Sequence, residues 1–206
     1  MKGEGRQVNN QIKSTDRRAK RSLLLLKQAF IALVKEKRFE SITIQDITER
    51  ADVNRSTFYA HFPDKYALLD SIIREHFQDL LASKLPLDAA WEKKSLYVVI
   101  QAVLEHFTAS RYCHPESIHP FFEKAVQEEL FSLFQNWLKQ VATNNEWRIP
   151  IDTIALMASW AIFGVAIDCS RKKNKASVKE ISDQILAVIV EGMDRLTPGG
   201  LPMADE

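Results

Sequence analysis

The spacing of apolar residues in the first third of the chain predicts two short helices around a tight turn. The first helix follows Thr43, whose hydroxyl is a good N-cap, and its apolar residues recur at three- and four-residue steps. The second follows Asn54, another strong N-cap type, and places Phe58 and Phe62 on one side. Pro63 ends it, because the proline ring removes the N–H that the next turn needs. We expect both helices to bury their apolar sides in one core.

The second of these helices is polar on the side opposite its phenylalanines. A helix of this kind has its back in a core and offers hydrogen-bonding groups to a partner outside the protein. This pattern is typical of a helix-turn-helix, whose second helix enters the major groove of DNA. The groups on its polar side belong to Arg55, Ser56, Thr57, Tyr59 and His61.

The segment TERADVNRSTFYAHFPDKYALL resembles the DNA-binding segment of the TetR family of bacterial transcriptional regulators. The resemblance covers residues 23–69, which lie within about the first third of the chain. It departs from the family pattern at two glycine positions, which are Asp52 in the turn and Arg38 after the first helix. The matching residues are Thr43, Ile47, Ala51, Val53, Thr57, Phe58, Tyr59, His61, Phe62, Lys65 and Leu68.

The resemblance implies which residues contact DNA. Thr43, Tyr59, His61 and Lys65 would hold phosphates, and Arg55, Ser56 and Thr57 would face base edges. With the N-cap residue included, the expected DNA-binding residues are Thr43, Asn54, Arg55, Ser56, Thr57, Tyr59, His61 and Lys65.

The rest of the chain carries helical patterns and no convincing strand, so the predicted fold class is all-α. An N-terminal three-helix DNA-binding domain with the helix-turn-helix is followed by a C-terminal helical bundle for ligand binding and dimerisation. The predicted helices outside the motif are residues 16–37, 65–83, 90–108, 121–142, 151–170 and 178–196. The expected domains are a flexible basic arm at residues 1–16, a DNA-binding domain at 17–64, a connecting helix at 65–85, an effector-binding and dimerisation domain at 86–196, and a tail at 197–206.

The charge of the chain is unevenly distributed, although the formal net charge is only +1. Residues 1–65 hold 14 Lys and Arg against 8 Asp and Glu, whereas the remainder holds 14 against 19. A basic N-terminal third favours a polyanion as partner, and the alternative is an ordinary solvated charge excess. The arm has two interpretations as well, a DNA contact or an ordinary disordered terminus.

Two helices of the C-terminal part carry apolar surface beyond the needs of a single bundle. By resemblance to the family they would pair with their twofold copies in a four-helix dimer interface. The alternative is a helix buried within its own protomer. The expected interface residues are Ala155, Ala158, Ile162, Gly164, Ile181, Ile185, Val188 and Ile189.

Aromatic residues are frequent in the same domain and would line an effector pocket or form plain core. The expected pocket residues are Phe107, Tyr112, Phe122, Trp137, Trp160 and Phe163. Four possible metal ligands, His106, Cys113, His114 and His119, match no standard zinc spacing. We therefore expect no metal and no cofactor.

Other classes of protein are not favoured. No catalytic motif, secretory signal or uninterrupted apolar run of about 18 residues is present, so we expect a cytoplasmic protein that is no enzyme and has no membrane partner. The favoured function is a dimeric repressor released from a near-palindromic operator by a small molecule. The alternatives are a regulator that responds to a protein partner, and a helical carrier or enzyme with an incidental helix-turn-helix.

Overall fold

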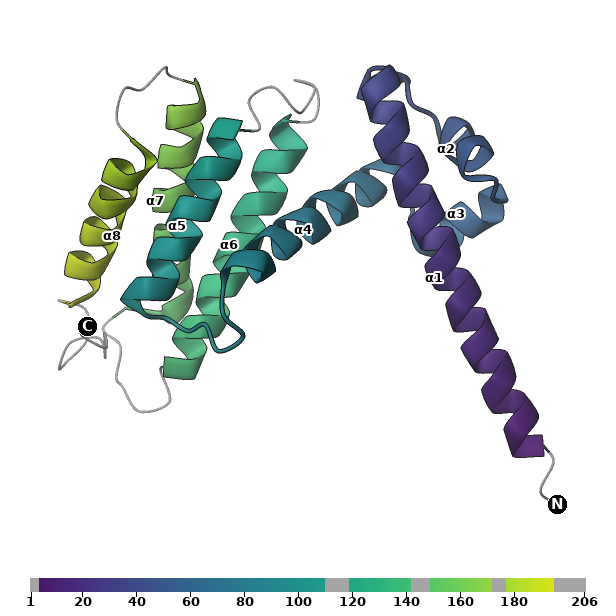
Figure 1. The fold of residues 1–206 in the computed structure, drawn as a ribbon, viewed down its shortest axis with the longest axis horizontal. Helices are drawn as coiled ribbons and strands as arrows, with labels where there is room; N and C mark the ends of the chain where they lie inside the picture. The colour runs from purple at the N-terminus through teal and green to yellow at the C-terminus, as the bar shows by residue number, and fades with distance from the viewer. Residues whose placement is uncertain (1–3, 110–118, 142–148, 172–176, 195–206) are drawn as a thin grey trace. The chain divides into compact units, whose positions relative to one another are not determined.

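The fold is all-α, as the sequence predicts. The computed structural model describes residues 4–109, 119–141, 149–171 and 177–194. Within these ranges it contains eight α-helices, one short 3-10 helix and no strand (Figure 1). The chain forms two compact units, and the division between them falls inside α4, between Ile72 and Ile73.

Helix α1 spans Glu4–Glu36 and is much longer than expected. The sequence analysis starts this helix near Asp16 and treats residues 1–16 as a flexible arm, but residues 4–16 are helical. The predicted start of this helix was wrong, because polar residues such as Gln, Lys and Arg continue a helix even where no apolar stripe marks one. The tail at residues 197–206 lies outside the described residues.

The helix-turn-helix occupies the first unit together with α1. After α1 come the 3-10 helix Phe39–Ser41, α2 at Ile44–Ala51 and α3 at Arg55–His61. The α2 helix packs against both α1 and α3. The side chains at the centre of this unit are fully buried, and they are Leu26, Phe30, Phe39, Ile47, Phe58 and Leu68.

The two positions that depart from the family's glycines behave differently. Asp52 has φ = 51° and ψ = 48°, a left-handed conformation that Asp adopts more easily than most residues. Arg38 has φ = −61° and ψ = 142°, which is ordinary extended backbone. The turn therefore keeps its left-handed geometry without glycine, and the end of α1 requires none.

Helix α4 spans Lys65–Lys84, close to the predicted range, and belongs to the first unit up to Ile72 and to the second unit beyond it. In the second unit, Arg74 forms ion pairs with Glu128 and with Glu129, the latter at 3.0 Å. Gln78 donates to Glu129 at 2.8 Å. These bonds fix the second half of α4 to α6.

The second unit is built from α5 at Lys93–Ala109, α6 at His119–Val141, α7 at Ile151–Arg171 and α8 at Val178–Asp194 (Figure 1). The sequence analysis ends an irregular segment at Pro120, whereas α6 already includes this residue. Proline is tolerated in the first turn of a helix, where its missing N–H has no intrahelical partner. Helix α5 is central and packs on both α7 and α8.

Helix α7 is the one described helix that is long and apolar enough to cross a membrane, by length and composition. The expectation from the sequence concerned uninterrupted apolar runs, and Ile151–Ser170 contains Asp152 and Asp168. Slightly less than half of Ile151–Ser170 is buried, and α7 packs on α5 and α8. A helix that is partly buried in a protein core and exposes further apolar residues can be as apolar as a membrane-spanning helix.

Candidate functional site

The second helix of the motif, α3, has the two-sided character that the sequence predicts. Phe58 is completely buried and Phe62 nearly so, whereas Arg55, Ser56 and Tyr59 are exposed. The ring centroids of Phe58 and Phe62 lie 6.0 Å apart. This packing holds the back of α3 in the unit and leaves its polar side outward.

The start of α3 is capped by Asn54. Its side-chain oxygen accepts the backbone N–H of Ser56 at 3.0 Å and is 3.1 Å from the Ser56 hydroxyl. Such a cap contributes about 1 kcal/mol to the stability of a helix. Asn54 therefore has a structural task in α3 besides any contact with DNA.

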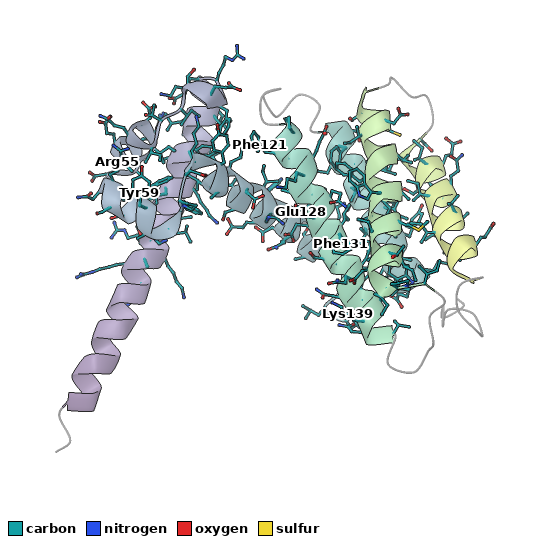
Figure 2. The ribbon with its side chains drawn as sticks, turned by 180° about the vertical axis from the view of Figure 1, so that it is seen from behind. Arg55, Tyr59, Phe121, Glu128, Phe131 and Lys139 are labelled. Carbon is teal, nitrogen blue, oxygen red and sulfur yellow. The ribbon has the colours of Figure 1, made fainter. Side chains whose placement is uncertain are left out.

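Arg55 and Tyr59 form a pair on the exposed side of α3 (Figure 2). The Arg55 guanidinium donates to the Tyr59 hydroxyl at 3.3 Å and lies 5.7 Å from the centre of the Tyr59 ring. This contact limits the orientations of the guanidinium. A guanidinium held in place is suited to bidentate contact with a guanine edge or a phosphate.

Thr43 forms a complete capping box with Asp46 at the start of α2. Both the backbone N–H and the hydroxyl of Thr43 donate to the Asp46 carboxylate at 2.7 Å. Lys37 lies 2.7 Å from the same oxygen, and these three donors hold the pKa of Asp46 well below its usual range, with Lys37 as the largest cause. The donors of Thr43 that the sequence analysis gives to a phosphate are thus taken by Asp46.

Lys65 is engaged within its own unit. Its ammonium donates to the carbonyl oxygens of Phe39 at 3.0 Å, Glu40 at 3.0 Å and Ile42 at 2.8 Å. It also lies 4.7 Å from the centre of the Phe39 ring. Because an ammonium has three donors, all are used, and this arrangement does not fit the expected phosphate contact of Lys65.

His61 of α3 contacts α1. Its Nε2 lies 2.9 Å from Oγ of Ser22, a residue that the sequence analysis did not single out. His61 and Ser22 line a hollow between α1 and α3, together with the exposed Arg18. The basic N-terminal third favours a polyanion partner, but only the fold shows that Arg18 of α1 lies beside α3.

The predicted effector residues separate into two groups. Phe107, Phe122 and Phe163 are mutually packed, with centroids 5.5 Å and 5.7 Å from Phe107, and Trp160 lies 5.5 Å from Phe163. Trp137 lies about four turns after Phe122 along α6 and packs against Phe134 instead. It therefore belongs to a separate part of the core, and Tyr112 lies outside the described residues.

A cavity of ≈ 470 Å³ opens between α6 and α7, next to the first of these groups. Trp160 and Phe163 form part of its wall and Gln127 supplies a nearly buried amide, 3.4 Å from the hydroxyl of Ser159. Phe107 and Phe122 are core residues behind this cavity. Its volume lies within the range of small-ligand sites.

Most of the predicted interface residues are buried within the protomer, which corrects that prediction. Ala155, Ala158, Ile162, Ile181, Ile185 and Ile189 are each at most 7% exposed. They are buried on α7 and α8, both of which pack on α5. The prediction failed because it took the apolar stripe of each helix for the outer side of the helix. Of the predicted set, Gly164 and Val188 are exposed.

The exposed apolar residues of α7 lie on a different side of the helix. We call them the outer face of α7, which consists of Leu156, Met157, Trp160, Gly164 and Val165. Met157 is 64% and Trp160 52% exposed. A Cβ built on Gly164 would meet nothing within 4 Å, so this part of the face is open.

Of the four residues considered as metal ligands, His106 is the one whose side chain the structure describes. No group of three or more His, Cys, Asp or Glu side chains in the described part of the chain could hold a metal ion. The ring of His106 stacks on Phe122 at 5.2 Å and lies 5.6 Å from the ring of His76. Cys113 and His114 lie outside the described residues, as does the side chain of His119.

Comparison with known proteins identifies the class of the chain. Residues 28–72 match the family model described as bacterial regulatory proteins, tetR family. This match supports the TetR family for the DNA-binding segment, and the similar proteins support a DNA-binding transcriptional regulator of the helix-turn-helix class.

Two curated relatives are similar to the chain. It is 28% identical over 122 residues to the uncharacterized HTH-type transcriptional regulator YxbF of Bacillus subtilis (strain 168), a match that covers 54% of this chain and 32% of YxbF. It is 25% identical over 175 residues to the HTH-type transcriptional repressor DhaR of Mycobacterium sp. (strain GP1), which covers 77% of this chain and 85% of DhaR. The match thus spans about a third of the length of the first relative.

The fold also resembles solved structures. A TetR transcriptional regulator from Streptococcus agalactiae 2603V superposes with a TM-score of 0.55 at 22% identity, covering 86% of this chain and 98% of that one. At this identity the likeness supports the fold, including the helical second unit that the family model does not reach.

Proposed function

We propose that this protein is a dimeric repressor that binds a near-palindromic operator and is released by a small-molecule effector. The observation that carries the proposal is α3, whose capped start and buried back present Arg55, Ser56 and Tyr59 outward as one polar edge. A relative of similar length, DhaR, is named a repressor, and a cytoplasmic location follows from this function.

The outer face of α7 is where a second copy of the chain packs. Leu156, Met157, Trp160 and Gly164 recur at helical spacing and are exposed, a surface that a lone protomer would leave in water. Val188 of α8, which is 70% exposed, extends this surface. A twofold dimer reads two half-sites about one helical turn of DNA apart, which makes the operator near-palindromic.

The cavity between α6 and α7 holds the effector. Trp160, Phe163 and Ile167 offer apolar contact, and the Gln127 amide offers a directional hydrogen bond. These groups suit a flat, largely apolar molecule that carries one polar group. Because Trp160 also belongs to the outer face of α7, the dimer and the effector site share this side chain.

A chain of ionic contacts connects this cavity to α4. Lys124 lines the cavity and lies 3.9 Å from Glu128, which pairs with Arg74 of α4. An effector that changes the position of α6 therefore acts on the helix that continues into the DNA-binding unit. It must bind the two arrangements with different affinity, since an equal binder shifts no population.

Two alternatives give different results. A regulator with a protein partner would keep its DNA affinity in the presence of every small molecule, and a carrier or enzyme would bind no preferred duplex. Selection of bound sequences from random duplex DNA, followed by a thermal-shift screen of small molecules, separates the three. Enrichment of one near-palindromic motif, together with a hit that lowers DNA affinity, supports the proposal, whereas no enriched motif would refute it.

A further inference from the structure

The mouth of the cavity between α6 and α7 lies partly on the outer face of α7. Trp160 and Gly164 line the cavity and also belong to this face. Phe163 and Gln127, which line the cavity as well, are buried. Trp160 is 52% exposed and Lys124 of α6 is exposed too, so the cavity opens to solvent on their side. The mouth is therefore next to the surface where, in the proposed function, a second copy of the chain packs.

Gly164 leaves space at this mouth that its own protomer does not fill. It lies inside α7, and a Cβ built on it would meet nothing within 4 Å. Glycine inside a helix costs about 1 kcal/mol relative to alanine, and no described neighbour requires it here. Glycine also allows another molecule to approach the backbone closely. The space beside Gly164 is therefore available to a ligand or to a second copy.

The order of side chains along the outer face indicates how two α7 helices pack. Met157 is 64% exposed and lies seven residues before Gly164, with Trp160 between them. In a twofold interface, residue i contacts j and j contacts i. Two parallel helices would set Met157 against Met157 and Gly164 against Gly164. Antiparallel helices that cross near Trp160 set Met157 of one copy against Gly164 of the other, which packs a large side chain into an open space and is favoured.

We propose that the second copy of the chain closes the cavity between α6 and α7 with its own Met157, so that both protomers hold the effector. This closure rests on the proposed dimer and effector site, and it adds that neither protomer forms the complete site alone. On closure, a bound apolar ligand loses contact with water at the mouth and gains apolar contact with the second copy. The dimer therefore binds the effector more tightly than a monomer does.

Effector binding and dimerisation are then linked. By reciprocity, a ligand that prefers the dimer must stabilise the dimer. Because a twofold dimer holds two such ligands, a preference of about tenfold per site tightens the dimer about a hundredfold at saturation. The effector-bound protein stays a dimer, so its release from DNA comes from a change in shape and not from separation of the two copies.

Disulfide cross-linking tests the geometry of the closure. In the full chain, Cys113→Ser and Cys169→Ala first remove the native thiols. Met157→Cys combined with Gly164→Cys should then join two copies on oxidation, because the two positions face each other across the interface. Within one helix they are about 10 Å apart, beyond the roughly 7 Å that a disulfide can span between Cα atoms. Each single variant should stay uncross-linked, and a cross-link in Met157→Cys alone would show parallel helices and overturn the closure.

Binding to the cavity is measured with 8-anilinonaphthalene-1-sulfonate, a largely aromatic probe whose fluorescence rises in apolar sites. The cross-linked dimer is compared with the monomer expected for Met157→Glu, once circular dichroism has shown that both are folded. Each is titrated with and without Ile167→Trp, which fills the cavity from its wall. The difference between the two titrations reports the cavity and removes binding to exposed apolar surface. We expect the cavity of the dimer to bind the probe at least about tenfold more tightly than that of the monomer.

The wild type provides a second measurement that needs no variant. Its dimer dissociation constant is measured by analytical ultracentrifugation with and without saturating probe. We expect the constant to fall by about the square of the affinity ratio between dimer and monomer, since two probes bind per dimer. Ile167→Trp is the matched control, in which the probe should leave the constant unchanged.

The outcomes separate this inference from the function on which it rests. Equal affinity of the cavity in dimer and monomer, or a wild-type dissociation constant that does not respond to the probe, would overturn the closure while the dimer and DNA binding stand. Absence of probe binding that Ile167→Trp removes would overturn it together with the effector site. A wild type that stays monomeric at micromolar concentration would overturn it together with the dimer, and DNA selection tests DNA binding separately.

Discussion

The ammonium of Lys65 donates to the carbonyl oxygen of Ile42 at 2.8 Å and thereby fixes the start of α4 to the residue before the capping box of α2. Two further carbonyls, of Phe39 and Glu40, accept from the same nitrogen. A side chain expected to hold DNA thus joins three segments of the DNA-binding unit.

The first prediction concerns this contact. Lys65→Ala should lower the free energy of unfolding by about 1–3 kcal/mol, because three partly buried carbonyls lose a charged donor. Urea denaturation followed by circular dichroism measures the change, with Lys35→Ala as the control at an exposed site of α1. If Lys65→Ala leaves the stability unchanged and weakens the salt dependence of DNA binding, Lys65 contacts a phosphate and this account of its role is wrong.

Base readout by α3 is tested at Arg55. Arg55→Ala should relax the preference at one base pair of the operator by about 1–3 kcal/mol, because in the proposed function the guanidinium contacts base edges. Tyr59→Phe should weaken all duplexes alike, since in the proposed function the hydroxyl contacts the DNA backbone. Binding to a library of single-base operator variants measures both, and uniform weakening by Arg55→Ala would show that it contacts phosphate only.

Asp46 makes the stability of the DNA-binding unit depend on pH. Since Lys37 and Thr43 hold its pKa below the usual value in the folded state, its stabilising contribution is present above about pH 4 and is lost as pH falls. Asp46→Asn should therefore be less stable than the wild type near pH 7, and the difference should shrink towards pH 3. Urea denaturation across this range measures it, and added salt should reduce the difference because the pair is accessible to solvent. A difference that stays constant with pH would contradict the ionic explanation.

The proposed dimer is tested on two sides of the same helix. Met157→Glu, on the outer face of α7, should give folded monomers, because it places a charge in the interface. Ala158→Glu should unfold the second unit, since Ala158 is only 5% exposed within the protomer. Light scattering combined with circular dichroism reports both, and Leu87→Glu, at an exposed position between α4 and α5, is the control that should change neither. A monomeric wild type at micromolar concentration would contradict the dimer.

The sequence predicts the helix-turn-helix well because its signals are local. The caps at Thr43 and Asn54 and the apolar spacing of α2 and α3 depend on residues a few positions apart. The partners of Lys65 and His61 lie 23–39 residues away, so only the fold reveals that one is structural and the other contacts Ser22. In the same way, the composition of α7 indicates two apolar sides but not which of them faces α5.

The central claim, that α3 reads a particular DNA sequence, is tested most directly by the ratio of two affinities at one salt concentration. The duplex recovered by selection and a scrambled duplex of the same composition are titrated with the full chain under the same conditions. The account predicts that the selected duplex binds at least about 10³-fold more tightly, as specific regulators do. Equal affinity for the two duplexes would contradict it.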